Sequence, residues 1–145
     1  MFSRTKFAAM AVLVAGLLLL AGAAQAQEKA AKALAKGEFH NADKTGSGTA
    51  TIYQLADGKR VLRLTDFAVD NGPDLHVRLI AANDAKNTAS VAKTDHLELG
   101  KLKGNKGSQN YDVPETVDLG KYKVVSIWCN RFSVNFAAAP LTAGK

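Results

Sequence analysis

The stretch TATIYQLADGKRVLRL, residues 49–64, decides the fold. Apolar and polar side chains alternate along it on both sides of the pair Asp57-Gly58. Alternation with a period of two is typical of a strand that buries one face. An Asp-Gly pair between two such runs is typical of a hairpin, because glycine tolerates the positive φ of a tight turn. The stretch therefore predicts two antiparallel strands joined by a short turn.

Similar runs follow along the chain. The run LHVRL at residues 75–79 comes after the turn NGPD, QNYDV at residues 109–113 ends at a proline, and FSVNF at residues 132–136 alternates again. The most apolar of these runs, YKVVSIWC at residues 122–129, predicts a central strand. No long segment after Lys36 has helical periodicity. We therefore predict an all-β fold, an antiparallel β-sandwich of about seven to nine short strands in a single domain.

The alternating apolar positions of the clearest strands predict the core. We expect the main packing to come from Leu62, Leu64, Val77, Leu79, Trp128, Phe132, Val134 and Phe136.

Residues 1–26 have the three parts of a secretory signal peptide. Arg4 and Lys6 precede an apolar run at residues 8–24, and Ala24-Gln25-Ala26 closes it with small residues. The alternative is an uncleaved membrane anchor, for which the run is short, since a span needs about 20 residues. We predict cleavage after Ala26, which places the protein in the periplasm or outside the cell with no stable membrane anchor.

The rest of the chain divides by composition. Residues 27–36, QEKAAKALAK, offer little apolar area, so we expect a flexible N-terminal segment there and a β-domain at residues 37–142. The chain carries a formal net charge of +6, but its basic residues are scattered rather than clustered. Nucleic-acid binding needs a basic patch, so we expect no nucleic-acid partner.

Cys129 is the single cysteine of the chain. Without an intrachain partner it pairs with another molecule, as in a dimer linked through Cys129, or stays free, or holds a ligand. It ends the predicted central strand after Trp128, where a side chain is more accessible, and Arg131 two residues on would favour the thiolate. The alternative is a small buried apolar residue, because Cys129 shares the strand face of Val125 and Ile127.

Other chemical signatures are weak. His40, His76 and His96 are not spaced for a metal site, and both methionines lie within residues 1–26, so a copper site lacks its axial ligand. His76, beside Arg78 on a polar strand face, is the histidine to which we assign a supporting role. We find no catalytic motif, and we expect a module without catalytic turnover and with no metal site.

Several motifs together resemble the DM-thirteen domain family. They include NGPDLHV at residues 71–77, GSQNY at residues 107–111 and VVSIWC at residues 124–129, and the resemblance covers about residues 37–141. The family is a small extracytoplasmic β-domain found beside DOMON and b-type cytochrome domains. The resemblance implies an electron-transfer role in which the family cysteine, here Cys129, acts as a thiol or as a ligand to a prosthetic group such as haem. The turn Gly72-Pro73-Asp74 is expected to be architectural.

Three hypotheses follow. The first is an exported redox module that uses Cys129, with Trp128, Arg131 and His76 in support, and with a separate redox protein or haem as its partner. The second is a non-redox extracytoplasmic binding sandwich whose cysteine is buried and inert. The third is a metallochaperone-like binder that joins His76 and Cys129.

Overall fold

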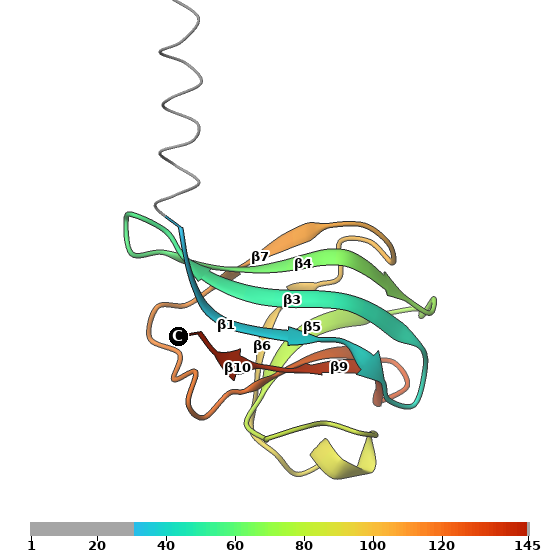
Figure 1. Ribbon diagram of the computed structural model, residues 1–145. Coiled ribbons are helices and arrows are strands. Elements are labelled where there is room, and N and C mark those ends of the chain that lie inside the picture. Colours follow the sequence, from blue (N-terminus) through green and yellow to red (C-terminus); the bar gives the residue numbers. More distant parts are fainter. Residues whose placement is uncertain (1–30, 145) are drawn as a thin grey trace, which may run out of the picture. The chain divides into compact units, whose positions relative to one another are not determined.

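The computed structural model describes residues 31–144, and the predicted signal peptide lies outside them. Two antiparallel sheets of five strands each form a β-sandwich (Figure 1). The first sheet has the order β10-β1-β3-β4-β7 and the second has the order β2-β9-β8-β5-β6. The strands are β1 (Lys32–Glu38), β2 (His40–Asn41), β3 (Gly46–Gln54), β4 (Arg60–Val69), β5 (Leu75–Ile80), β6 (His96–Lys101), β7 (Gln109–Val113), β8 (Val124–Cys129), β9 (Val134–Pro140) and β10 (Thr142–Ala143). The predicted all-β sandwich is confirmed.

The predicted hairpin is β3–β4. The two strands pair with Ile52 opposite Leu62 and Tyr53 opposite Val61. Gly58 takes φ 89° in the turn, and the Leu55 amide donates to the Lys59 carbonyl over 2.7 Å. The predicted hairpin and its turn at Asp57-Gly58 are therefore confirmed.

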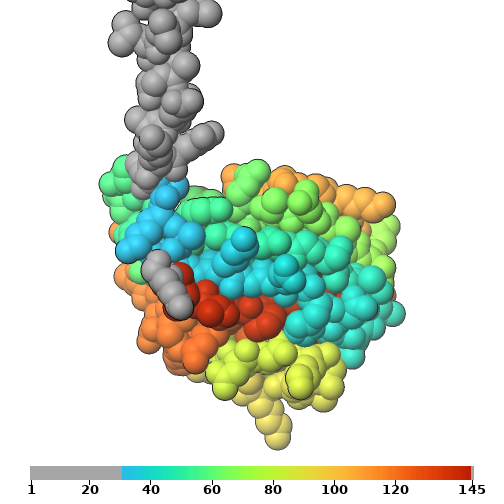
Figure 2. All heavy atoms as spheres, viewed as in Figure 1, coloured from blue at the N-terminus to red at the C-terminus, as the bar shows by residue number. Residues whose placement is uncertain are grey.

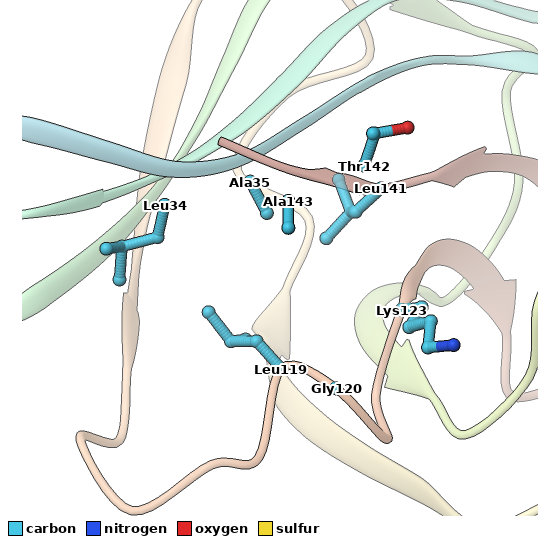
Figure 3. Close-up of a pocket in the computed structure, with 8 residues that line it drawn as sticks. All are labelled: Leu34, Ala35, Leu119, Gly120, Lys123, Leu141, Thr142 and Ala143. Carbon is cyan, nitrogen blue, oxygen red and sulfur yellow. The ribbon is translucent and has the colours of Figure 1, made fainter. Parts of the chain in front are cut away.

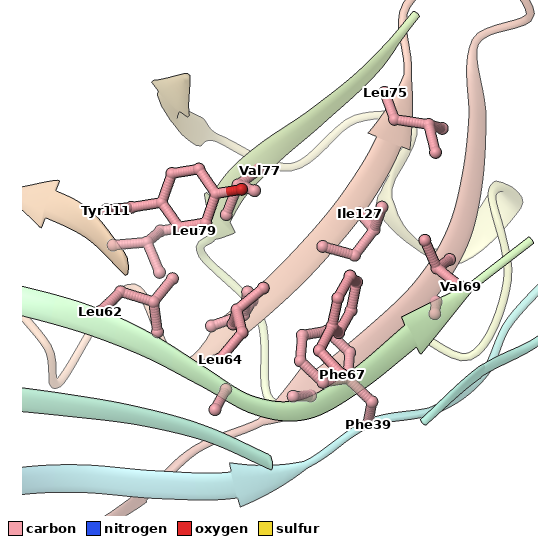
Figure 4. Close-up of a cluster of buried hydrophobic side chains, with 14 of the residues drawn as sticks. Phe39, Leu62, Leu64, Phe67, Val69, Leu75, Val77, Leu79, Tyr111 and Ile127 are labelled. Carbon is pink, nitrogen blue, oxygen red and sulfur yellow. The ribbon is translucent and has the colours of Figure 1, made fainter. Parts of the chain in front are cut away.

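The core lies between the two sheets. Figure 4 shows side chains of β4, including Leu62, Leu64 and Phe67, facing Val77 and Ile127 of the second sheet, and all of these are buried. The rings of Phe39 and Phe67 pack with their centroids 5.1 Å apart. Burying one such side chain stabilises a fold by about 1.5–3 kcal/mol, so this layer supplies the main stabilisation of the sandwich.

Two predicted core residues lie outside the main core, and a third lies at its edge. Phe132 is 59% exposed, Trp128 lies half-buried against a separate apolar cluster, and Val134 is half-buried against the main core. The pairing of β8 with β9 shifts register between Ile127 and Trp128, and residues 130–133 form a turn in which Ser133 has φ 52°. Strand β9 therefore begins at Val134, and the alternation expected from Phe132 onward does not apply to the turn.

Part of the N-terminal segment that we predicted to be flexible is in fact strand β1. The structure places Lys32–Glu38 in a strand that pairs with β3 on one side and β10 on the other. In Figure 2 the C-terminal residues lie directly beside β1 on the surface. The domain therefore extends beyond the predicted boundaries of residues 37–142 at both ends. Residues 27–30 lie outside the described part.

A long connection, residues 81–95, covers part of the outer face of the second sheet, and we call it the covering loop. It contains one 3-10 turn, Ala89–Val91, and contributes Ala85 and Val91 to an apolar cluster with Ile80, Val124 and Ala138. Within residues 31–144, no helix is long and apolar enough to cross a membrane.

Candidate functional site

Cys129 lies in the interior of the sandwich. It ends β8, with Leu75 of β5 opposite it on one side and Val134 of β9 on the other. Its side chain belongs to the main core cluster and is 0% exposed. The predicted accessibility of this strand end is therefore wrong: β8 is the middle strand of its sheet, and both neighbouring strands run alongside its last residue.

A short turn closes the sandwich directly after Cys129. The Asn130 amide donates to the Asp74 carbonyl over 2.9 Å, which ties residues 130–133 to the loop before β5. Arg131 and Phe132 are exposed in this turn. Arg131 therefore lies at the surface while the thiol lies in the core, so nothing in the fold presents Cys129 to solvent beside Arg131.

The turn Gly72-Pro73-Asp74 packs closely against the core. A Cβ atom on Gly72 would lie 2.8 Å from Leu75 Cδ2 and 2.9 Å from Phe136 Cε2, so any larger residue would displace buried side chains. Pro73 is exposed, and Asp74 supplies the carbonyl that binds Asn130. The geometry gives this turn an architectural place beside the Cys129 end of the sandwich.

His76 and Cys129 point to opposite faces of the second sheet. Across β5 and β8, His76 lies opposite Trp128, while Leu75 lies opposite Cys129. Neighbouring side chains of a strand alternate between faces, so an interior thiol and an outer-face imidazole cannot share a ligand. In the described residues, moreover, no three His, Cys, Asp or Glu side chains gather as a metal site. The metal-binding hypothesis that joined His76 with Cys129 is wrong.

His76 is buried between two carboxylates, although the sequence placed it on an outward or groove face. It is 7% exposed. Its Nε2 lies 2.8 Å from Asp74 Oδ1, and its Nδ1 lies within ion-pair distance of Glu98 Oε1 on β6 without an aligned hydrogen bond. The alternating pattern of β5 could not reveal this, because the covering groups come from a turn and from a neighbouring strand.

Arg78 links this cluster to Trp128 and to the turn after Cys129. Its guanidinium carbon lies 4.8 Å from the centroid of the Trp128 ring, and its Nη2 donates to Asn130 Oδ1 over 2.9 Å. Burial lowers the pKa of Arg78 below its ordinary value, and the nearby Glu98 carboxylate opposes that shift. Trp128 and His76 thus belong to one polar and aromatic cluster on the outer face.

A second histidine pair was missed from the sequence. His40 Nε2 lies 2.6 Å from Asp84 Oδ1 of the covering loop, and His40 Nδ1 lies 2.8 Å from the Asn41 carbonyl. Burial alone would lower the pKa of His40, but these two partners outweigh it and raise that pKa from 6.5. The pKa of Asp84 is lowered from 3.8, because hydrogen bonds from His40 and the Ala85 amide outweigh the opposing effect of its burial.

Haem does not fit at Cys129 in this fold. A ligating sulfur must face a space that admits the porphyrin, whereas this sulfur is enclosed by packed side chains. The ring nitrogens of His76 and His40 already face other groups.

A cavity of about 400 Å³ lies away from Cys129, near the start of β1. Leu34, Leu119 and Leu141 line it together with Lys123 and the small residues of β10 (Figure 3). The Lys123 ammonium donates to Asn83 Oδ1 over 3.3 Å. The cavity is therefore a recess with both polar and apolar lining, and Lys123 brings one cation to it.

The fold and the cysteine together define a class of protein: a small antiparallel β-sandwich with one buried cysteine at the end of its central strand. Residues 38–141 match the family model described as electron transfer DM13. The chain belongs to this family, which is associated with electron transfer. No curated protein and no solved structure matches the chain.

Proposed function

We propose that this protein is exported and acts as an electron-transfer module whose redox group is the Cys129 thiol. The observation that carries the proposal is the family match over residues 38–141, which includes the lone cysteine at the end of β8. The signal-peptide pattern of residues 1–26 supports action in the periplasm or outside the cell. Separate redox proteins are the partners.

A lone thiol transfers electrons by exchange with a partner disulfide. Cys129 loses its proton to water, and its sulfur attacks one sulfur of the partner's disulfide. That disulfide breaks, the other partner sulfur leaves as a thiolate, and a mixed disulfide forms. Attack on the partner's sulfur by one thiolate of a second protein's dithiol then breaks the mixed disulfide, returns Cys129 as a thiolate and joins the second protein to the partner. The other thiolate of that dithiol displaces the partner's sulfur, so that the second protein's dithiol becomes a disulfide, the partner's disulfide becomes a dithiol, and two electrons have passed between them.

Burial makes this chemistry conditional on opening. A sulfur at 0% exposure cannot reach a partner's disulfide, so the packing around it must open first. The turn at residues 130–133 directly follows Cys129, and one backbone hydrogen bond, from Asn130 to Asp74, ties it to the loop before β5. A dimer linked through Cys129 requires the same opening.

The alternative is a non-redox binding sandwich with an inert cysteine, and the complete burial of Cys129 favours it. Free cysteines are among the most buried residue types and often serve as small apolar side chains. The two functions differ in whether the folded protein ever exposes its thiol.

Thiol labelling of the folded protein separates them. Native protein and protein unfolded in denaturant are treated with the same disulfide reagent at one pH, and the labelled fraction is followed by mass spectrometry. The electron-transfer proposal predicts labelling of folded protein well above the rate set by global unfolding. Labelling only at the global unfolding rate, measured on the same sample, would leave the binding sandwich as the function.

A further inference from the structure

Three leucines are only half-buried around one recess of the sandwich. Leu34 of β1, Leu119 of the loop before β8 and Leu141 after β9 pack against the main core, and all three line the cavity of about 400 Å³ (Figure 3). We call this cavity the leucine recess. Exposing apolar side chains to water is unfavourable, and a cavity of this volume is large enough for a small ligand. An apolar group that enters the recess would therefore be stabilised there.

The leucine recess forms where the chain crosses from the second sheet to the first. Strand β9 of the second sheet ends at Pro140, and the short β10 pairs with only Ala35 and Lys36 of β1 in the first sheet. Cys129 lies at the other end of β9, opposite its first residue, Val134. The recess is therefore a second candidate site, separate from the thiol.

One cation at the edge of the recess has no carboxylate partner within residues 31–144. Lys123 Nζ donates to the uncharged Asn83 Oδ1 over a long 3.3 Å, and in Figure 3 its ammonium points away from the leucines. Lys121 of the same loop, in contrast, pairs with Asp95 over 3.3 Å. The nearby Asp118 carboxylate accepts a backbone amide of its own loop over 2.8 Å. The charge of Lys123 is therefore available to attract an anion outside the apolar part of the recess.

We propose that the leucine recess binds the chain of a medium-chain fatty acid and that Lys123 attracts its carboxylate. The chain lies among the three leucines, where the small side chains of Ala35 and Ala143 leave room for it. The carboxylate stays at the edge in contact with water, because burying a charge is costly. A neutral apolar molecule would make no use of Lys123, and a small polar anion would leave the leucines uncovered. An aliphatic chain with a carboxylate head group fits both features.

Titration calorimetry of the purified protein with hexanoate, octanoate and decanoate, each below its micelle concentration, tests the site. Burying one methylene group raises an association constant about fourfold, so affinity should rise by about that factor with each added methylene while the chain still fits. Decanoate should bind in a ratio of one molecule to one protein. The neutral 1-octanol, which has as many carbon atoms as octanoate, measures the contribution of the chain alone.

Two variants with matched controls separate the chain from the charge. Lys123→Gln should weaken octanoate binding roughly two- to fivefold, the effect of one exposed ion pair, and leave 1-octanol binding unchanged. Lys44→Gln removes an exposed cation from the loop before β3 and should change neither. Ala143→Leu fills the recess and should weaken both ligands roughly tenfold or more, because the chain would then overpack it. Ala33→Leu makes the same change at an exposed position of β1 outside the recess and should keep both affinities.

Methyl resonances of the natural protein give a second measurement that needs no variant. Decanoate should shift the methyl signals of Leu34, Leu119 and Leu141 and leave that of Leu64, in the core, unchanged. Shifts confined to other residues would overturn the proposal, because the chain would then bind elsewhere.

The absence of saturable binding, or an affinity that does not rise with chain length, would also overturn it. Equal weakening of octanoate and 1-octanol by Lys123→Gln would contradict the role of the charge. A dimer of the reduced protein that decanoate dissociates would assign the recess to a second copy of the chain instead. None of these outcomes involves the thiol, so the recess and the electron-transfer role are tested separately.

Discussion

Cys129 lies directly opposite Leu75 across the pairing of β8 with β5, and both residues are buried in the core between the sheets. The sulfur therefore occupies a packing position, and a change of its chemistry affects stability as well as reactivity. Leu75 is the first residue of β5, so the family's cysteine lies next to the turn before β5. Gly72 and Asp74 belong to that turn, at the same end of the sandwich.

Replacing Cys129 should separate packing from chemistry. Cys129→Ser places a hydroxyl among apolar side chains, and leaving it unpaired should cost about 1–3 kcal/mol of unfolding free energy. Cys129→Ala leaves no unpaired polar atom and should cost less than the serine variant. Urea unfolding of the three proteins measures this order. Serine as stable as cysteine would mean that the site is wetter than the structure shows.

Replacing two phenylalanines near the same turn should change the unfolding free energy by very different amounts. Phe136→Ala empties a position that is 2% exposed and should destabilise the protein by about 3–5 kcal/mol. Phe132→Ala changes a side chain that is 59% exposed and should alter stability by less than about 0.5 kcal/mol. Thermal or urea unfolding of both variants checks the prediction, and comparable losses would show that the turn at residues 130–133 is packed rather than exposed.

The His40–Asp84 pair should add a pH-dependent contribution to stability. Because the folded pKa of His40 is raised from 6.5, its contribution is fully present below that value and is lost as the pH rises through the folded pKa. Because the pKa of Asp84 is lowered from 3.8, its contribution is present above 3.8 and is lost as the pH falls through the folded pKa. The pair should therefore stabilise most between these two values.

The difference in unfolding free energy between the natural protein and His40→Gln measures that contribution as a function of pH. Both side chains are about one-third exposed, so the difference should stay below about 1 kcal/mol. His96→Gln, at an exposed position, serves as the matched control for the loss of a surface imidazole. A difference that grows above neutral pH would contradict the assigned direction.

Export predicts a defined mature N-terminus. The small residues Ala24 and Ala26 close the apolar run of residues 8–24, so cleavage should leave Gln27 as the first residue. Intact-mass analysis of the protein recovered from the periplasm or medium measures this. Recovery of a chain that retains residues 1–26 would contradict it and favour the membrane-anchor alternative.

The alternating segments of the sequence predicted most of the sandwich because each buries one face against the other sheet. Strand β1 escaped because its residues are mostly Ala and Lys; it forms through pairing with β3 and β10 and carries a register shift between Ala33 and Ala35. Phe132 was misplaced because the shift at Ile127 and the positive φ of Ser133 interrupt the alternation. Such irregularities depend on neighbouring strands, which the local pattern does not contain.

Only part of the candidate site could be predicted from the sequence, for the same reason. The position of Cys129 at the end of β8 follows from a local apolar run, whereas its burial depends on β5, β9 and a turn that are distant in sequence. The carboxylates around His76 likewise come from the turn before β5 and from β6, which no spacing rule joins to His76.

Redox equilibration of the folded protein tests the central claim most directly. Native protein is held in glutathione buffers of graded potential, thiols are trapped with acid, and the fraction of Cys129 in a mixed disulfide is read by mass spectrometry, with circular dichroism recording the fold. The account predicts a mixed disulfide at Cys129 that forms and reverses with the potential while the sandwich stays folded. A thiol that remains unmodified at every potential until denaturant unfolds the protein would contradict it.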